Sequence, residues 1–205
     1  MSSDWAGENL QVIRTLMERS AIYRRALAPI MLLLGVLGVG AAALARAYQP
    51  LAEKGFTEYW LAVSILGAGL AFLMVRRQAF RGEESFWSPP TRRVVQAALP
   101  AIFVGLMAAI WGLESGSKLP LGYLPPIWMA LYGCALNAAG FFMPRGMKLF
   151  GWLFIASSGA AGIYLHSAWP ISTPTAHLMM GGAFGGLHLI YGLYLQFTEP
   201  QQNEA

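Results

Sequence analysis

The residues best suited to chemistry in this sequence are polar side chains set inside long apolar runs. His177, His188 and Tyr191 lie in the last run, and Asn137 lies in the fourth. A polar group at membrane depth is costly and is retained for a reason, so these four side chains are the candidate ligand-binding residues. A flat or chain-like apolar molecule, such as a quinone, a carotenoid, a haem or a lipid tail, could lie near His188 and Asn137.

Metal and nucleophilic chemistry are poorly supported by the same residues. His177 and His188 are 11 residues apart, about 16 Å along a helix axis, so they cannot ligate one iron. The chain has three histidines and one cysteine, Cys134, which leaves no catalytic metal cluster and no disulfide. Ser157 and Ser158 have no nucleophile-elbow motif and no acidic residue at their depth. We therefore expect no enzyme, no metal and no defined cofactor, although an unidentified hydrophobic ligand is compatible with the sequence.

Small residues accompany the histidines of the last run. On a helical wheel of 100° per residue, Gly181, Gly185 and Gly192 share a narrow stripe with both histidines. Pairs of small residues four apart let a neighbouring helix backbone approach closely. The residues predicted to pack helices in this way are Gly181, Gly182, Gly185, Gly186, Ser158 and Gly162.

Two interpretations of this stripe remain open. In the structural one, the stripe is pressed against the fourth or fifth run, and His188 bonds Asn137, a tyrosine hydroxyl or a backbone carbonyl. In the functional one, the glycines leave a slot for an apolar ligand, with His188 as its polar contact. A cavity at the midplane would favour the second interpretation.

The elements that position these residues follow from composition. Hydrophobic residues make up 56% of the 205 residues, charged residues 12%, and the mean hydropathy is +0.49, whereas soluble domains carry about 25% charged residues. An all-α, polytopic membrane protein is predicted, with a transmembrane domain over 27–197 and no room for a separate soluble catalytic domain. Its six predicted spans are 27–48, 58–76, 94–114, 122–143, 149–168 and 175–197.

The distribution of basic residues predicts the orientation. Eleven of the 14 Lys and Arg residues lie on the side of both termini, and Arg46, Lys54 and Lys118 lie on the other. The positive-inside rule then puts both termini in the cytoplasm, with the protein in a bacterial inner membrane. The arginines expected to contact lipid headgroups or a partner are Arg14, Arg19, Arg24, Arg25, Arg76, Arg77, Arg81, Arg92 and Arg93.

Residues 1–26 are predicted to form a cytoplasmic amphipathic helix, and 198–205 a polar cytoplasmic tail. Trp5, Leu10 and Ile13 share one arc of the helical wheel, while Glu8 and Arg14 lie on the other. Such a helix either lies on the membrane surface or docks a partner protein. With the loop 76–93 it forms the main cytoplasmic surface, where a membrane or cytoplasmic protein partner is expected. The pI near 9.4 reflects orientation and lipid contact, not binding to nucleic acid.

Two segments carry a resemblance to a known group of proteins. The segment Ile-Arg-Thr-Leu-Met-Glu-Arg-Ser over 13–20 and Gly-Gly-Leu-His-Leu-Ile-Tyr-Gly over 185–192 are similar to segments of small bacterial membrane proteins that have no assigned activity. The resemblance implies six spans, and genes that lie beside small winged-helix regulators. The expected function is a non-enzymatic accessory, scaffold or sensor subunit; the alternative is a binder or carrier of a small hydrophobic molecule.

Overall fold

The computed structural model describes residues 27–48, 55–81, 87–114, 121–143, 145–168 and 170–198, and all regular secondary structure in these ranges is helical. This confirms the all-α class. The predicted amphipathic helix over 1–26, with Arg14, Arg19, Arg24 and Arg25, lies outside the described residues, as does the tail from 199 onward.

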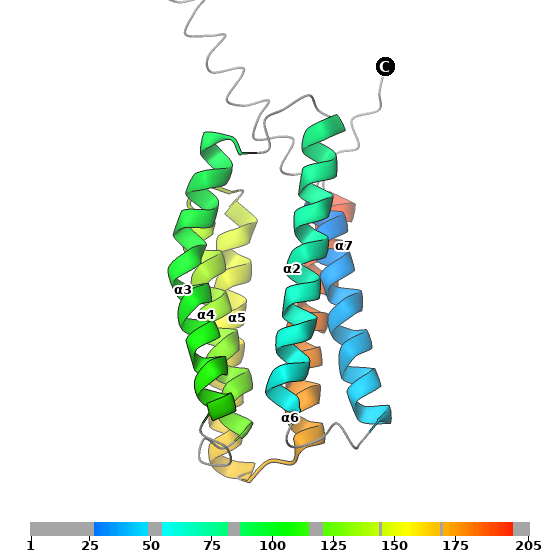
Figure 1. Cartoon of the computed structure of the whole chain (residues 1–205), viewed down its shortest axis with the longest axis vertical. Helices are drawn as coiled ribbons and strands as arrows, with labels where there is room; N and C mark the ends of the chain where they lie inside the picture. The colour runs from blue at the N-terminus through cyan, green and yellow to red at the C-terminus, as the bar shows by residue number, and fades with distance from the viewer. Residues whose placement is uncertain are drawn as a thin grey trace, which may run out of the picture.

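In the described residues six helical rods run alternately up and down, so that the start of the first rod and the end of the last rod lie at the same end of the bundle, here called the terminal end (Figure 1). Five of them are long and apolar enough to cross a membrane. The other rod, α4, has 16 residues. The rods are Leu27–Ala47 (the first helix), α2 (Phe56–Arg81), α3 (Pro89–Glu114), α4 (Leu124–Ala139, preceded by the 3₁₀ turn η3, Leu121–Tyr123), α5 (Arg145–Ala168) and the last helix, Thr173–Thr198.

The last helix has three parts with different hydrogen-bonding patterns. It begins as α6 (Thr173–Met180), continues as a π-helix, η4 (Gly181–Leu187), and ends as α7 (His188–Thr198). Its start is capped by Ser172, whose hydroxyl accepts a hydrogen bond from the backbone N–H of Thr175 at 3.4 Å. A serine is favoured at this position because it satisfies a backbone donor that has no partner within the helix.

Proline and glycine explain other helix boundaries. Prolines lie at the first positions of α3 and α4, where a missing backbone N–H costs nothing. The fourth predicted span extends to 143, but α4 ends at Ala139 and the chain turns at Gly140. A Cβ on Gly140 would lie 2.7 Å from Cγ of Lys148 on α5, so this turn requires a residue without a side chain.

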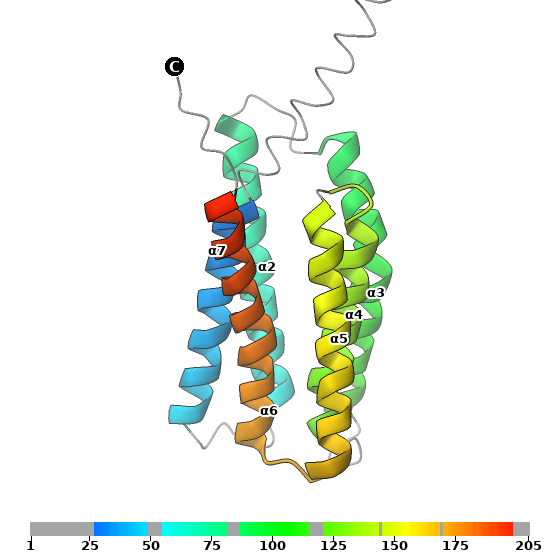
Figure 2. The same cartoon turned by 180° about the vertical axis from the view of Figure 1, so that it is seen from behind.

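The rods form two groups of three, as two opposite views show (Figures 1 and 2). One group is α3, α4 and α5; the other is the first helix, α2 and the last helix. Within the first group α4 packs closely against both α3 and α5, whereas α2 and α3, although consecutive in the chain, touch only sparsely. Two buried clusters join the groups, and Phe184 of the last helix packs against both. The candidate site lies in these clusters.

Candidate functional site

The π-helical segment decides where the two histidines of the last helix lie. Hydrogen bonds in a π-helix span five residues instead of four, so each residue turns through a smaller angle than in an α-helix. Between His177 and His188 the segment η4 covers seven residues. The predicted common stripe of both histidines is therefore wrong: His177 contacts α2, and His188 contacts α4 and α5.

His177 lies near the start of the last helix, at the end of the bundle opposite the terminal end. The indole N–H of Trp60 on α2 donates a hydrogen bond to Nδ1 of His177 at 3.0 Å, and both side chains are almost fully buried. The rings of Phe56 and Tyr59 lie 4.9 and 5.8 Å from the imidazole. An Nδ1 that accepts a hydrogen bond puts the ring proton of the neutral imidazole on Nε2. That buried Nε2 has no hydrogen-bond partner among the described residues.

His188 lies in a second aromatic cluster, between the two groups of helices. Its Nε2 is 2.8 Å from the hydroxyl of Tyr132 on α4, and the side chain is 2% exposed. The rings of Phe150 and Phe154 on α5 lie 5.2 and 5.4 Å away. Of the three partners expected for His188, the structure has the tyrosine hydroxyl. The other nitrogen, Nδ1, faces the backbone of the preceding turn without a well-formed hydrogen bond.

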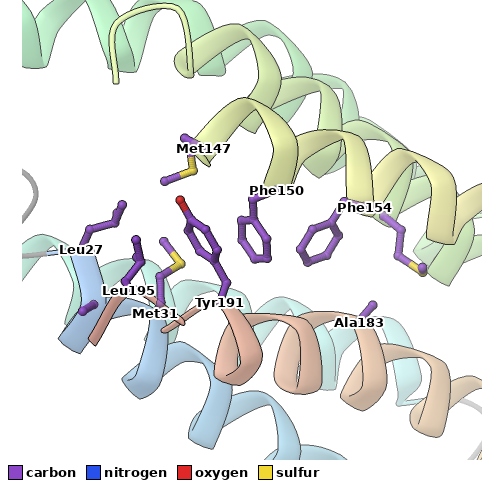
Figure 3. Close-up of a cluster of buried hydrophobic side chains, with 10 residues drawn as sticks. Leu27, Met31, Met147, Phe150, Phe154, Ala183, Tyr191 and Leu195 are labelled. Atoms are coloured by element: carbon purple, nitrogen blue, oxygen red, sulfur yellow. The ribbon is translucent and has the colours of Figure 1, made fainter. Parts of the chain in front are cut away.

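Tyr191 extends this cluster toward the terminal end. Its ring stacks on Phe150 with centroids 4.3 Å apart and planes 11° apart. Figure 3 shows the rings of Tyr191, Phe150 and Phe154 in a row between α5 and the last helix, with Met147 and Met31 beside them. Side chains of the protein itself thus fill the space around His188.

The glycines of the last helix pack against the first helix, not against the fourth or fifth as expected. A Cβ on Gly185 would lie 2.5 Å from the backbone nitrogen of Val39, and one on Gly38 would lie 2.7 Å from the nitrogen of Gly185. Gly181 meets Ala42 in the same way, and Gly192 meets Leu32. Gly181, Gly185 and Gly192 keep the common stripe that the wheel predicts, but a wheel does not determine which neighbouring helix that stripe meets.

The other predicted packing residues have different surroundings. Nothing lies within 4 Å of a Cβ built on Gly182, Gly186 or Gly162. The hydroxyl of Ser158 donates a hydrogen bond to the carbonyl of Pro126 on α4 at 2.8 Å. These residues thus form no second glycine seam between α5 and the last helix.

Asn137 is not brought to His188 by a hydrogen bond. Its amide donates to the backbone carbonyl of Lys148 on α5 at 3.4 Å. A close crossing that was not predicted lies beside it, where a Cβ on Gly133 would be 2.7 Å from the carbonyl oxygen of Gly151. The sequence also did not predict Trp60 as the partner of His177, or Gly38 as the partner of Gly185. For Gly38 a signal existed, because Gly35, Gly38 and Ala42 have helical spacing in the first run.

The predicted headgroup arginines that the structure describes lie at the terminal end. Arg76 and Arg77 are exposed in the last turns of α2, and Arg92 and Arg93 are exposed at the start of α3. The side chain of Arg81 lies outside the described part of the structure. Among the described residues no three metal-ligating side chains gather in one place.

The arrangement offers two buried imidazoles, each hydrogen-bonded to an aromatic side chain of a neighbouring helix. Such pairs can orient a ring or hold two helices together. Searches of protein-family models, of curated proteins and of solved structures find no match to this chain.

Proposed function

We propose that this protein is a non-enzymatic accessory, scaffold or sensor subunit of a bacterial inner membrane. In this proposal six helices span the bilayer, the terminal end is cytoplasmic, and 1–26 with the loop 76–93 binds a protein partner. The sixth span is α4: it is short, but the chain carries no charge from Leu119 to Pro144. It also packs closely between α3 and α5, so that spanning neighbours flank it.

The observation that carries the proposal is the backbone contact between Gly38 and Gly185. A carrier needs a slot along the glycines of the last helix, and this contact fills that slot with the first helix. His188 is bonded to Tyr132 and surrounded by phenylalanine rings, so its polar group already has a protein partner. The close contact of Gly38 with Gly185 and the hydrogen bond of His188 to Tyr132 support a structural role for the last helix.

One observation favours the alternative, a binder of a small hydrophobic molecule near His188 and Asn137. The buried Nε2–H of His177 has no acceptor among the described residues, and a buried donor without a partner costs about 1–3 kcal/mol. A carbonyl oxygen of a ligand would satisfy it. This observation supports a ligand at His177. It gives less support for a ligand at His188, because Nε2 of His188 already lies within hydrogen-bond distance of Tyr132.

Purification in a mild detergent, followed by an absorbance spectrum and native mass spectrometry of the same sample, distinguishes the two functions. The accessory role predicts a colourless protein that retains a second polypeptide and loses it when residues 1–20 are deleted. A stoichiometric pigment or quinone that disappears in His188→Ala or His177→Ala would overturn it in favour of the binder.

A further inference from the structure

A hollow with a volume of about 410 Å³ opens on the surface of α2 near the terminal end. Among the described residues it is lined by Leu73, Arg76, Arg77 and Phe80. Intervals of three, four and seven residues put these side chains on one face of the helix. Two cationic and two apolar side chains therefore share a surface hollow in the last turns of α2, a helix that is long and apolar enough to cross a membrane.

The two arginines are suited to an anion with a fixed geometry. The guanidinium carbon of Arg76 lies 5.4 Å from the ring centroid of Phe80, a cation–π contact that holds the charge at the end of the helix. Arg77 is exposed beside it. Guanidinium groups bind phosphate through two parallel hydrogen bonds, so an adjacent pair suits a phosphate group.

Toward the opposite end, an apolar track continues the same face of α2. At 100° per residue Ala62, Leu66 and Gly69 fall within the arc centred on Leu73. Leu66 and Leu73 are 52% and 57% exposed, and nothing lies within 4 Å of a Cβ built on Gly69. A glycine between two exposed leucines leaves open space on this face of the helix. From Ala62 to Arg77 the track is about 22 Å long, more than the roughly 15 Å depth of one leaflet.

We infer that this face of α2 binds one anionic phospholipid, whose phosphate contacts Arg76 and Arg77 and whose acyl chain lies along Leu73, Gly69 and Leu66. Charge complementarity selects the headgroup, and the apolar track accounts for the tail. A free phosphate would leave the track unused. A water-soluble protein could not reach a track that lies in hydrocarbon. The inference requires that α2 spans the membrane and does not depend on the accessory role.

The test titrates the full-length protein with phosphatidylglycerol and, separately, with phosphatidylcholine, and counts bound lipids by native mass spectrometry. One phosphatidylglycerol should be retained in preference to phosphatidylcholine. The double variant Arg76→Ala/Arg77→Ala should bind it roughly 30-fold more weakly, because two basic groups near an anionic headgroup are lost. Lys148→Ala is the control: it removes a basic group near the start of α5, outside the hollow on α2, and should retain the lipid.

Gly69→Leu tests the tail without changing charge. The new side chain would extend into open space on the exposed face of α2, so the fold should be kept, and the space for the acyl chain should be filled. Phosphatidylglycerol binding should weaken several-fold. Equal retention of the two lipids, a loss in Lys148→Ala as large as in the arginine double variant, or full displacement of the lipid by millimolar inorganic phosphate would each overturn the inference. Because His188 is not involved, lipid retention that is unchanged in His188→Ala separates this result from the test of the proposed function.

Discussion

The hydroxyl of Tyr132 on α4 lies 2.8 Å from Nε2 of His188 on the last helix, and this hydrogen bond joins the two groups of three helices. Phe154 on α5 packs against both rings of the pair, and Phe150 packs against the imidazole. Hydrogen bonds between membrane helices are worth about 0.6 kcal/mol on average and up to about 1.7 kcal/mol. The hydrogen bond is therefore expected to fix the relative position of the two groups of helices. It should supply only a small part of the free energy of unfolding.

Tyr132→Phe should lower the free energy of unfolding by about 1 kcal/mol, because the buried Nε2 of His188 loses its partner. Thermal or detergent-induced unfolding, followed by circular dichroism, measures the change. The control is Tyr164→Phe on α5, since Tyr164 is 49% exposed. Equal stability of the two variants would contradict the structural role of the hydrogen bond.

Gly185→Ala and Gly186→Ala form a matched pair on neighbouring residues of one helix. A methyl group on Gly185 would be forced against the backbone of Val39, whereas one on Gly186 would meet nothing within 4 Å. We expect Gly185→Ala to destabilise the fold by about 1–3 kcal/mol, as overpacking does, and Gly186→Ala to be neutral or slightly stabilising. The same unfolding measurement checks both. A greater loss in Gly186→Ala would mean that the first helix packs on a different face.

The hydrogen bond from Trp60 predicts which nitrogen of His177 carries the proton. Nitrogen NMR of histidine-labelled protein in nanodiscs should show His177 as the Nε2–H tautomer, because Nδ1 accepts from the indole. Trp60→Phe removes the donor and should produce a mixture of tautomers at His177. The signal of His188 serves as the internal reference, since its partner Tyr132 is unchanged. A proton on Nδ1 of His177 in the unmodified protein would contradict the hydrogen bond.

The proposed orientation predicts which ends of the helices are reached from outside the cell. In a Cys134→Ala background, a membrane-impermeant maleimide should label Ser172→Cys in intact spheroplasts, because Ser172 is exposed before the last helix. Thr198→Cys should react only after permeabilisation, because it lies at the terminal end with most of the basic residues. The reversed pattern would place the termini outside.

The lengths of the apolar runs were enough to predict most of the helices. A segment in hydrocarbon must satisfy its backbone hydrogen bonds internally, so each long apolar run implies a helix. Run length located the first helix, α2, α3, α5 and the last helix, and the polarity of His188 within its run indicated a side chain in need of a partner. Run length was less exact at helix ends, as at Ala139, because the turn there depends on how closely Gly140 approaches α5.

Which side chains meet was decided only by the tertiary structure. The sequence determined that His177, Gly185 and His188 belong to one helix; a wheel of fixed angle could not determine that a π-helical segment, which contains Gly185, lies between the two histidines. That segment changes the rotation between the two histidines. The packing of the neighbouring helices brings Gly185 to Gly38, His177 to Trp60 and His188 to Tyr132. The physical reason is that apolar runs contain many small and aromatic residues able to pair, and the choice among them depends on backbone geometry and on the packing of all the helices together.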